Sequence, residues 1–481
     1  MAESRTGSDT GRGGPVARPG RVLATVCLCQ LMVVLDISVV NVALPEIGRD
    51  LGFAPGGLSW VVNAYTLVFG GLLLLGGRIA DLFGHRRATI AGLALFGVAS
   101  LLGGLAQTPG QLVAARAGQG LAAAVLAPIS LTVIMVTFEE GAPRRRALGS
   151  WTMVAISGGA LGVLLGGVLT DLLDWRWVMF VNVPLVVLAL PLALSSVRTG
   201  GGGSRRLDIA GASLGTAAMT VLVFGLLETE KHPWGSLRTL ATLGGAALLA
   251  VAFVLWERRS AAPLVRLSVF ASRTVWLANV LSLLVGAATV AGFYFASLFL
   301  QHVLDYDPLA AGVAFLPFCG GAVLGSFAAS RLVGRVDGRL LIGGGLALGG
   351  VGMLWFGTLR PDSTFLGGFL GPSLVASVGI GLSVMANTAM GTSRVASDEA
   401  GLVSGLLNAS RQCGGSVGLA ALSTVAVTVT DNAATADPVA ALADGYARAF
   451  SCVGVGVLAA SLLAVLLVPR LPAPRNQTQN A

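Results

Sequence analysis

The chain has 481 residues, of which 54% are apolar and only 11% charged, with a mean hydropathy of +0.82 and a formal net charge of +8. This balance excludes a soluble globular protein. Uncharged runs of about 20 residues recur, and no run alternates as a transmembrane barrel strand does, so we expect an all-α polytopic membrane protein. The basic residues lie mostly beside apolar runs, which makes them markers of orientation and not a surface for nucleic acid.

The apolar runs divide the chain into five regions. Residues 1–20 are rich in Gly, Arg, Ser and Pro and predict a disordered cytoplasmic tail, and 469–481 predict a second cytoplasmic tail. Six spans form an N-terminal bundle over 21–197, a linker and two inserted helices occupy 198–260, and six spans form a C-terminal bundle over 261–468. The fourteen predicted spans are 22–44, 58–77, 88–106, 111–138, 147–169, 177–197, 209–227, 239–256, 275–300, 310–330, 340–359, 365–390, 402–429 and 447–468.

The arginines predict which side of the membrane each loop occupies. With both termini in the cytoplasm, 23 of the 31 basic residues lie on the inner side and six on the outer side, while Arg116 and Arg411 lie within spans. We therefore expect a multi-pass protein of the cell membrane with the lipid bilayer as its surroundings.

The connector over residues 77–87 concentrates charge and glycine between two long apolar runs. Gly84 permits a positive backbone φ, and a positive-inside loop accounts for the arginines but not for Asp81. The spacing resembles the loop between spans 2 and 3 of the major facilitator superfamily, with His85 in place of the more usual basic residue. The resemblance implies a cytoplasmic gate formed by Gly77, Asp81, Gly84, Arg86 and Arg87.

Three ionisable side chains lie well inside predicted spans: Asp36, Arg116 and Arg411. Such residues are costly in lipid and are functional candidates by default. Asp36 and Arg116 are expected at a similar depth, where they form either a coupling site or a purely structural ion pair. Arg411 enters from the inner side and either snorkels to the surface or lines an inner cavity. The first run carries Asp36 and lacks a cleavage site, so we expect it to be retained as span 1.

Several motifs resemble the fourteen-span drug:proton antiporters, the major facilitator branch that includes multidrug and actinomycete antibiotic-resistance exporters. They are Leu35-Asp36 to Pro45 in span 1, Arg116 to Pro128 in span 4, 175–184 before span 6 and 408–418 in span 13. The resemblance implies two six-helix bundles plus two inserted helices, and proton-coupled efflux of a small amphipathic compound by alternating access. It also implies a functional monomer without cofactors. The residues implied at the cavity are Asp36, Asn41, Arg116, Gln119 and Arg411.

Span 5 departs from the antiporter pattern because Val163 stands where the family has proline. Glycines repeat here on one side of the helix and predict close helix packing, either with a gating role or as ordinary membrane-helix packing. Gly158, Gly162 and Gly166 form this repeat every four residues, and Gly167 is a fourth residue expected in helix packing.

Four other residues could contact a substrate: Trp60, Tyr65, Tyr294 and Asn408. Aromatic rings can stack on an aromatic ligand, but anchoring at the membrane interface or contact with lipid accounts better for most of these aromatic residues.

Other function classes find little support in the sequence. The single lysine, Lys231, lies in a predicted outer loop, so the chain lacks an ATP-binding P-loop, and its three histidines form no metal or catalytic motif. We expect neither a metal nor an enzyme. A facilitator or exporter of an ordinary metabolite remains the main alternative, and a non-transporting sensor is disfavoured because the polar ends are short.

Overall fold

The structure is a computed structural model, and it describes residues 19–54, 57–139, 142–196, 208–229, 232–261, 263, 267–333, 335–392, 400–433, 435 and 437–469. The described residues form helices and their connections, without a β-strand. Nearly all of both predicted tails and most of the predicted linker lie outside the described residues.

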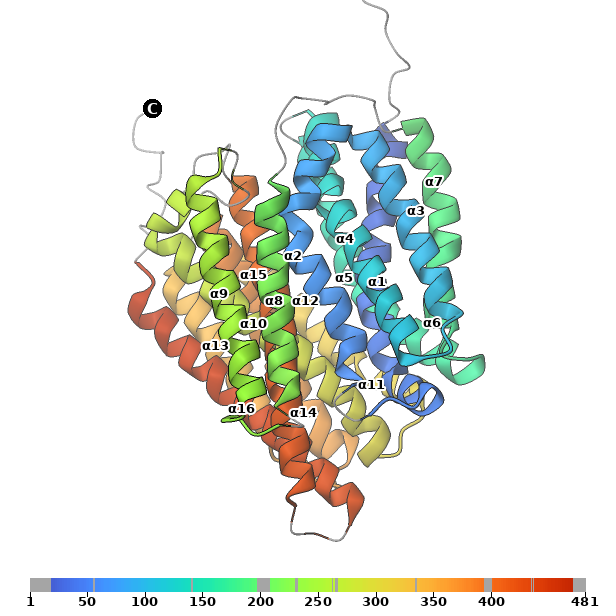
Figure 1. The fold of residues 1–481 in the computed structure, drawn as a ribbon, viewed down its shortest axis with the longest axis vertical. Helices are drawn as coiled ribbons and strands as arrows, with labels where there is room; N and C mark the ends of the chain where they lie inside the picture. The colour runs from blue at the N-terminus through green and yellow to red at the C-terminus, as the bar shows by residue number, and fades with distance from the viewer. Residues whose placement is uncertain are drawn as a thin grey trace, which may run out of the picture.

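The N-terminal bundle contains two pairs of closely packed long helices, α1 on α5 and α2 on α4, with α3 against α4 (Figure 1). The chain passes from span to span in short turns. Its helices are α1 (Pro19–Leu51), α2 (Ser59–Phe83), α3 (His85–Gly104), α4 (Pro109–Thr137), α5 (Ala142–Leu172), α6 (Trp177–Phe180) and α7 (Asn182–Ser196).

The C-terminal bundle repeats this packing, with α10 on α15 and α12 on α14. Its elements are the short η1 (Leu267–Ala271), α10 (Arg273–Leu298), the π-helical turn η2 (Phe299–Val303), α11 (Pro308–Ala314), α12 (Leu316–Leu332), α13 (Gly338–Phe356), a second π-helical turn η3 (Phe365–Phe369), α14 (Leu370–Thr392), α15 (Ala400–Asp431) and α16 (Pro438–Leu467). The two bundles meet along α2–α15 and along α5–α11.

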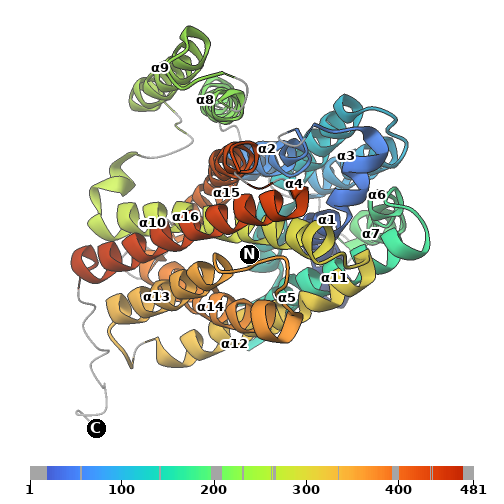
Figure 2. The ribbon, with the colours of Figure 1, turned by 90° about the horizontal axis from the view of Figure 1, so that it is seen from below.

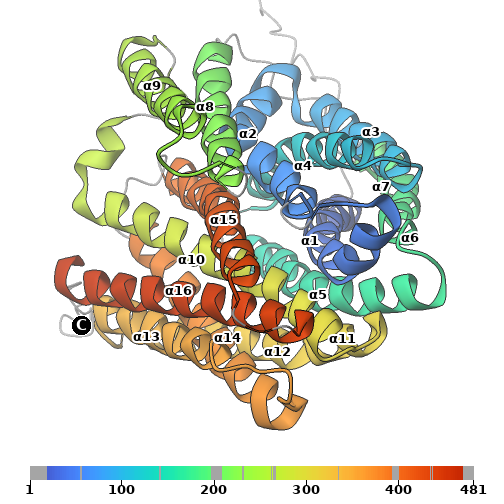
Figure 3. The ribbon, with the colours of Figure 1, turned by 60° about the horizontal axis from the view of Figure 1, so that its bottom comes forward.

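The inserted helices α8 (Ile209–Glu228) and α9 (Leu237–Arg259) form a hairpin outside both bundles (Figures 2 and 3). Helix α8 packs on both α2 and α15, and α9 packs on α8. Val223 of α8 joins Leu67 and Ala420 in one buried cluster, so α8 covers the line along which the bundles meet. Most of α9 is exposed and apolar, as expected for a helix that faces lipid.

Twelve helices among the described residues are long and apolar enough to cross a membrane, and Ser59–Leu73 and Ser157–Leu172 form shorter apolar stretches. The prediction of an all-helical, multi-pass membrane protein is therefore confirmed. The count of fourteen spans remains a prediction.

The connector between the second and third spans is shorter than the predicted loop over 77–87. Helix α2 continues to Phe83 and α3 begins at His85, so that Gly84 alone separates them. Gly84 has a φ of 82°, a conformation that residues with a Cβ rarely adopt. The prediction of a positive φ is confirmed. The predicted extent of the loop was wrong, because polar and charged residues can continue a helix beyond the apolar run.

We call the side on which α1 begins and α16 ends the terminal face, and the side on which α1 ends the distal face. The terminal face lies at the top of Figure 1.

Candidate functional site

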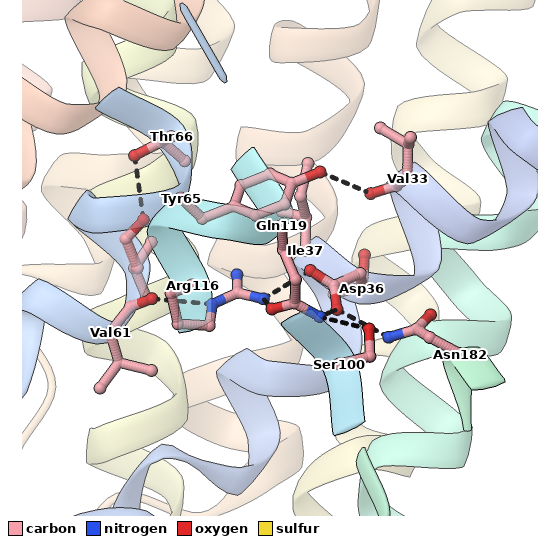
Figure 4. Close-up of polar contacts among 12 residues, drawn as sticks. Val33, Asp36, Ile37, Val61, Tyr65, Thr66, Ser100, Arg116, Gln119 and Asn182 are labelled. Carbon is pink, nitrogen blue, oxygen red and sulfur yellow. Dashed lines mark hydrogen bonds and ion pairs between the residues drawn. The ribbon is translucent and has the colours of Figure 1, made fainter. Parts of the chain in front are cut away.

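A charged cluster lies in the interior of the N-terminal bundle (Figure 4). Arg116 Nη1 of α4 lies 2.5 Å from Asp36 Oδ2 of α1, and both side chains are fully buried. A buried charge is stable only when it is paired and hydrogen-bonded. The structure therefore brings together the two charges expected at a similar depth.

The other oxygen of Asp36 is held by two amides. Gln119 Nε2 and Asn182 Nδ2 each donate to Asp36 Oδ1 at 2.8 Å. Gln119 Nε2 also lies 2.9 Å from Ser100 Oγ. The carboxylate thus accepts hydrogen bonds from α4 and α7, and Ser100 of α3 supports one of its donors.

Arg116 is positioned by groups other than Asp36. Its Nε donates to the carbonyl of Val61 at 3.0 Å, and its Nη1 donates to Gln119 Oε1 at 2.7 Å. The guanidinium carbon lies 4.5 Å from the centre of the Tyr65 ring, and Tyr65 Oη donates to the carbonyl of Val33 at 3.4 Å. Arg116 therefore has fixed partners on α2 and α4 that do not depend on the charge of Asp36.

Asn41 lies outside this cluster. Its Nδ2 donates to the carbonyl of Ile37 at 2.7 Å, and its main-chain oxygen accepts from Ser297 Oγ of α10 at 2.7 Å. Gln301 Nε2 donates to the carbonyl of Val42 at 2.9 Å. Asn41 thus lies where the two bundles meet near the distal face.

Arg411 lies in the C-terminal bundle, apart from the charged cluster. It lines a cavity of about 120 Å³ between α10, α14 and α15, together with Ser282, Asn387 and Asn408. Arg411 Nη2 donates to Asn408 Oδ1 at 2.7 Å. Two of the predicted residues, Asn408 and Arg411, therefore share one polar cavity.

The three aromatic candidates lie in different surroundings. Tyr65 is fully buried against Arg116 and belongs to the charged cluster, not to a cavity wall. Trp60 packs on the cluster that joins α8 to both bundles. Tyr294 lines a largely apolar cavity of about 350 Å³ towards the distal face, with His302 and Asp431. The structure does not bring these rings together.

The predicted gate residues are described only in part. Gly77 and Asp81 lie in α2, but the surroundings of Gly77 and the side chain of Asp81 lie outside the described part of the structure. Arg86 is half-buried and Arg87 exposed at the start of α3. The role of Asp81 remains a prediction.

The glycines of α5 face two different neighbours. A Cβ on Gly162 would lie 2.8 Å from the carbonyl oxygen of Leu35, and one on Gly166 would lie 2.6 Å from that of Val39, so both pack directly on α1. Gly158 also faces α1. A Cβ on Gly167 would instead lie 2.6 Å from the carbonyl oxygen of Pro308 in α11. Only Gly167 among the four lies between the bundles.

Two members of the charged cluster were not selected from the sequence as site residues. Asn182 belongs to the motif over 175–184, so its position offered a signal, whereas Ser100 lies in an ordinary apolar run. Among the described residues, no group of three His, Cys, Asp or Glu side chains could hold a metal ion.

Comparison with known proteins gives one consistent family. A profile described as the Major Facilitator Superfamily matches residues 26–419. The cephamycin export protein of Amycolatopsis lactamdurans is 44% identical, and the match covers 99% of this chain and 98% of that protein. The puromycin resistance protein of Streptomyces alboniger is 40% identical over 96% of this chain and 93% of its own length. The lincomycin resistance protein of Streptomyces lincolnensis is 36% identical, with coverages of 95% and 93%.

Solved structures share the fold. An inward-facing, occupied bacterial homologue of the human lysosomal transporter Spinster has a TM-score of 0.68 at 17% identity, over 95% of this chain and 97% of that one. The peptide transporter POT in complex with sulfate has a TM-score of 0.68 at 16% identity, with coverages of 92% and 94%. At these identities the likeness concerns the fold alone.

Proposed function

Because the chain belongs to the Major Facilitator Superfamily, we propose that it exports an antibiotic or another amphipathic toxic compound from the cell in exchange for protons. The names of the export and resistance proteins to which it is similar support efflux as the direction of transport. The observation that carries the proton coupling is the buried pair of Asp36 and Arg116, a titratable acid held in the interior of a membrane bundle.

Protonation of Asp36 would change how α1 is held in its bundle. It removes the negative charge that attracts Arg116 and takes up one of the acceptor positions used by Gln119 and Asn182. Arg116 keeps its bonds to Val61 and Gln119, so α4 stays joined to α2 while its attachment to α1 weakens. Protonation of Asp36 would therefore weaken the contact between α4 and α1. A helix contact that exists in two states is the kind of element that alternating access requires.

The distal side of the molecule supplies the element that such a change would move. Ser297 of α10 and Gln301 of η2 donate hydrogen bonds to main-chain oxygens of α1 across the line between the bundles, and Gly167 brings α5 against α11. We propose that this state is closed towards the exterior, that the terminal face is cytoplasmic and that the chain has fourteen spans. The bias of 23 basic residues on one side supports this orientation.

The test of proton coupling uses everted membrane vesicles with an imposed pH gradient and measures accumulation of cefoxitin, puromycin or lincomycin. Asp36→Asn is expected to abolish gradient-driven accumulation of whichever compound the wild type accumulates, while exchange without a gradient persists at least in part. Asp50→Asn is the matched control, because Asp50 lies on the same helix but is exposed and pairs with Arg176 at 2.9 Å.

Gradient-driven accumulation that survives in Asp36→Asn would assign coupling to another residue. Failure of the wild-type protein to accumulate any of the compounds would contradict drug efflux itself. Reporter fusions near residues 203 and 478 are expected to signal from the cytoplasm and one near 234 from outside. A cytoplasmic signal at 234 would rule out the fourteen-span topology.

A further inference from the structure

Arg411 is a cation in the interior of a bundle without an acid beside it. Among the described residues, no carboxylate oxygen lies within 4.0 Å of its guanidinium nitrogens, and its Nη2 donates to the neutral side chain of Asn408. Arg116, the other arginine inside a bundle, has Asp36 directly against it. Because an isolated cation in a membrane interior is costly, the charge of Arg411 requires an anion or water from outside the fold.

The cavity beside Arg411 offers a second donor. Ser282 Oγ accepts a hydrogen bond from Asn387 Nδ2 at 2.9 Å, which leaves the hydroxyl proton of Ser282 for another acceptor. The same Nδ2 donates to the carbonyl of Ala278 at 2.9 Å. Because a carbonyl only accepts, this bond fixes which end of the Asn387 amide carries the nitrogen. The amide therefore orients Ser282 as a donor towards the cavity.

The remaining wall makes the cavity selective for an organic group. Val285, Val384 and Leu407 supply apolar surface beside the guanidinium. The volume of about 120 Å³ holds one functional group with a few attached carbons, not a whole drug. A planar guanidinium with a hydroxyl donor and apolar neighbours is suited to a carboxylate on an apolar body.

We propose that this cavity binds the carboxylate of the exported compound, so that the preferred cargo is an organic acid or a zwitterion. The proposal rests on the proposed efflux function and specifies its substrate class. The two arginines then have different roles. Arg116 pairs with the fixed carboxylate of Asp36, and Arg411 binds a carboxylate that arrives with the cargo.

The test measures binding of two acids, cefoxitin and benzylpenicillin, each against its methyl ester, to the purified full-length protein in lipid nanodiscs. The ester keeps the body of the compound and removes its charge. Wild type is expected to bind at least one acid about tenfold or more tightly than its ester, since a charge-assisted hydrogen bond is roughly twice as strong as a neutral one. In Arg411→Gln the ratio of acid to ester affinity should fall close to one, and Arg411→Lys should retain part of it.

Arg331→Gln is the matched control, because it removes an arginine of α12 that lies over the ring of Phe327 and does not line the cavity. The ratio of its affinity for the acid to its affinity for the ester should equal that of the wild type. The proposal is overturned if neither acid is preferred by the wild type, or if Arg411→Gln keeps the preference. Export of puromycin or lincomycin by a protein without any preference for acids would leave drug efflux standing and remove only the carboxylate site.

Discussion

In the N-terminal bundle α1 lies along α5, and in the C-terminal bundle α10 lies along α15, with glycines at both contacts. A Cβ on Gly414 would lie 2.0 Å from the carbonyl oxygen of Leu283, much as Gly166 meets Val39. The polar interiors nevertheless differ. The first bundle neutralises its arginine with its own acid, whereas the second leaves Arg411 beside a cavity. Helix packing and buried charge thus vary independently in this fold.

The largest expected effect is a difference in stability between variants of the two arginines. Arg116→Gln leaves the Asp36 carboxylate buried without its cation, which should lower the free energy of unfolding by about 3–5 kcal/mol. Arg411→Gln leaves no buried carboxylate behind and should change it by less than about 1 kcal/mol. Thermal unfolding of the purified proteins in one detergent measures both.

The double variant Asp36→Asn with Arg116→Gln sharpens this result, because it removes both charges and should recover much of the stability lost in Arg116→Gln. Equal losses for Arg116→Gln and Arg411→Gln would show that the two bundles do not differ in the way described.

The second prediction concerns the packing that the bundles share. Gly166→Ala and Gly414→Ala each place a methyl group against a backbone carbonyl of the partner helix, so each should cost about 1–3 kcal/mol of stability. Gly149→Ala in α5 meets open space and should be neutral or slightly stabilising, since alanine favours helix. Unfolding midpoints measure all three. A large cost in only one bundle would contradict the shared packing.

The smallest expected effect lies where α2 and α15 join the bundles. Ser416 Oγ and Thr66 Oγ1 lie 2.7 Å apart across this contact, and Thr66 also donates to its own helix at Val62. Ser416→Ala should therefore cost only about 0.5–1.5 kcal/mol. Thr428→Val, which removes a hydroxyl bonded within α15, is the control. A loss as great as that of Arg116→Gln would mean that this single hydrogen bond holds the bundles together.

The features that could be predicted from the sequence depend on residue types that are rare in their surroundings. Few charges occur inside apolar runs, so Asp36 and Arg116 could be selected and placed at a similar depth. Gly84 could be identified as a helix break because only glycine readily takes a positive φ there.

Features that depend on tertiary contacts could not be predicted from the sequence. Ser100 and Tyr65 are ordinary residues in membrane helices, and only the arrangement of α2, α3 and α4 brings them to Gln119 and Arg116. The π-helical turn at Phe299–Val303 leaves no periodic signal in so short a segment. The different neighbours of Gly166 and Gly167 likewise follow from helix orientation, which the spacing of glycines alone does not give.

The hairpin of α8 and α9 covers one flank of the molecule and not the other, so the two flanks present different surfaces to the hydrocarbon of the membrane. Along α2–α15 a hydrophobic solute that diffuses within the bilayer meets α9 and α8 before it reaches the line between the bundles. Along α5–α11 no such cover stands in the described part of the chain. A solute that approaches sideways from the membrane therefore reaches the packed contact between α5 and α11 directly, whereas α8 and α9 stand between it and the contact between α2 and α15, a directional bias set by two helices that belong to neither bundle.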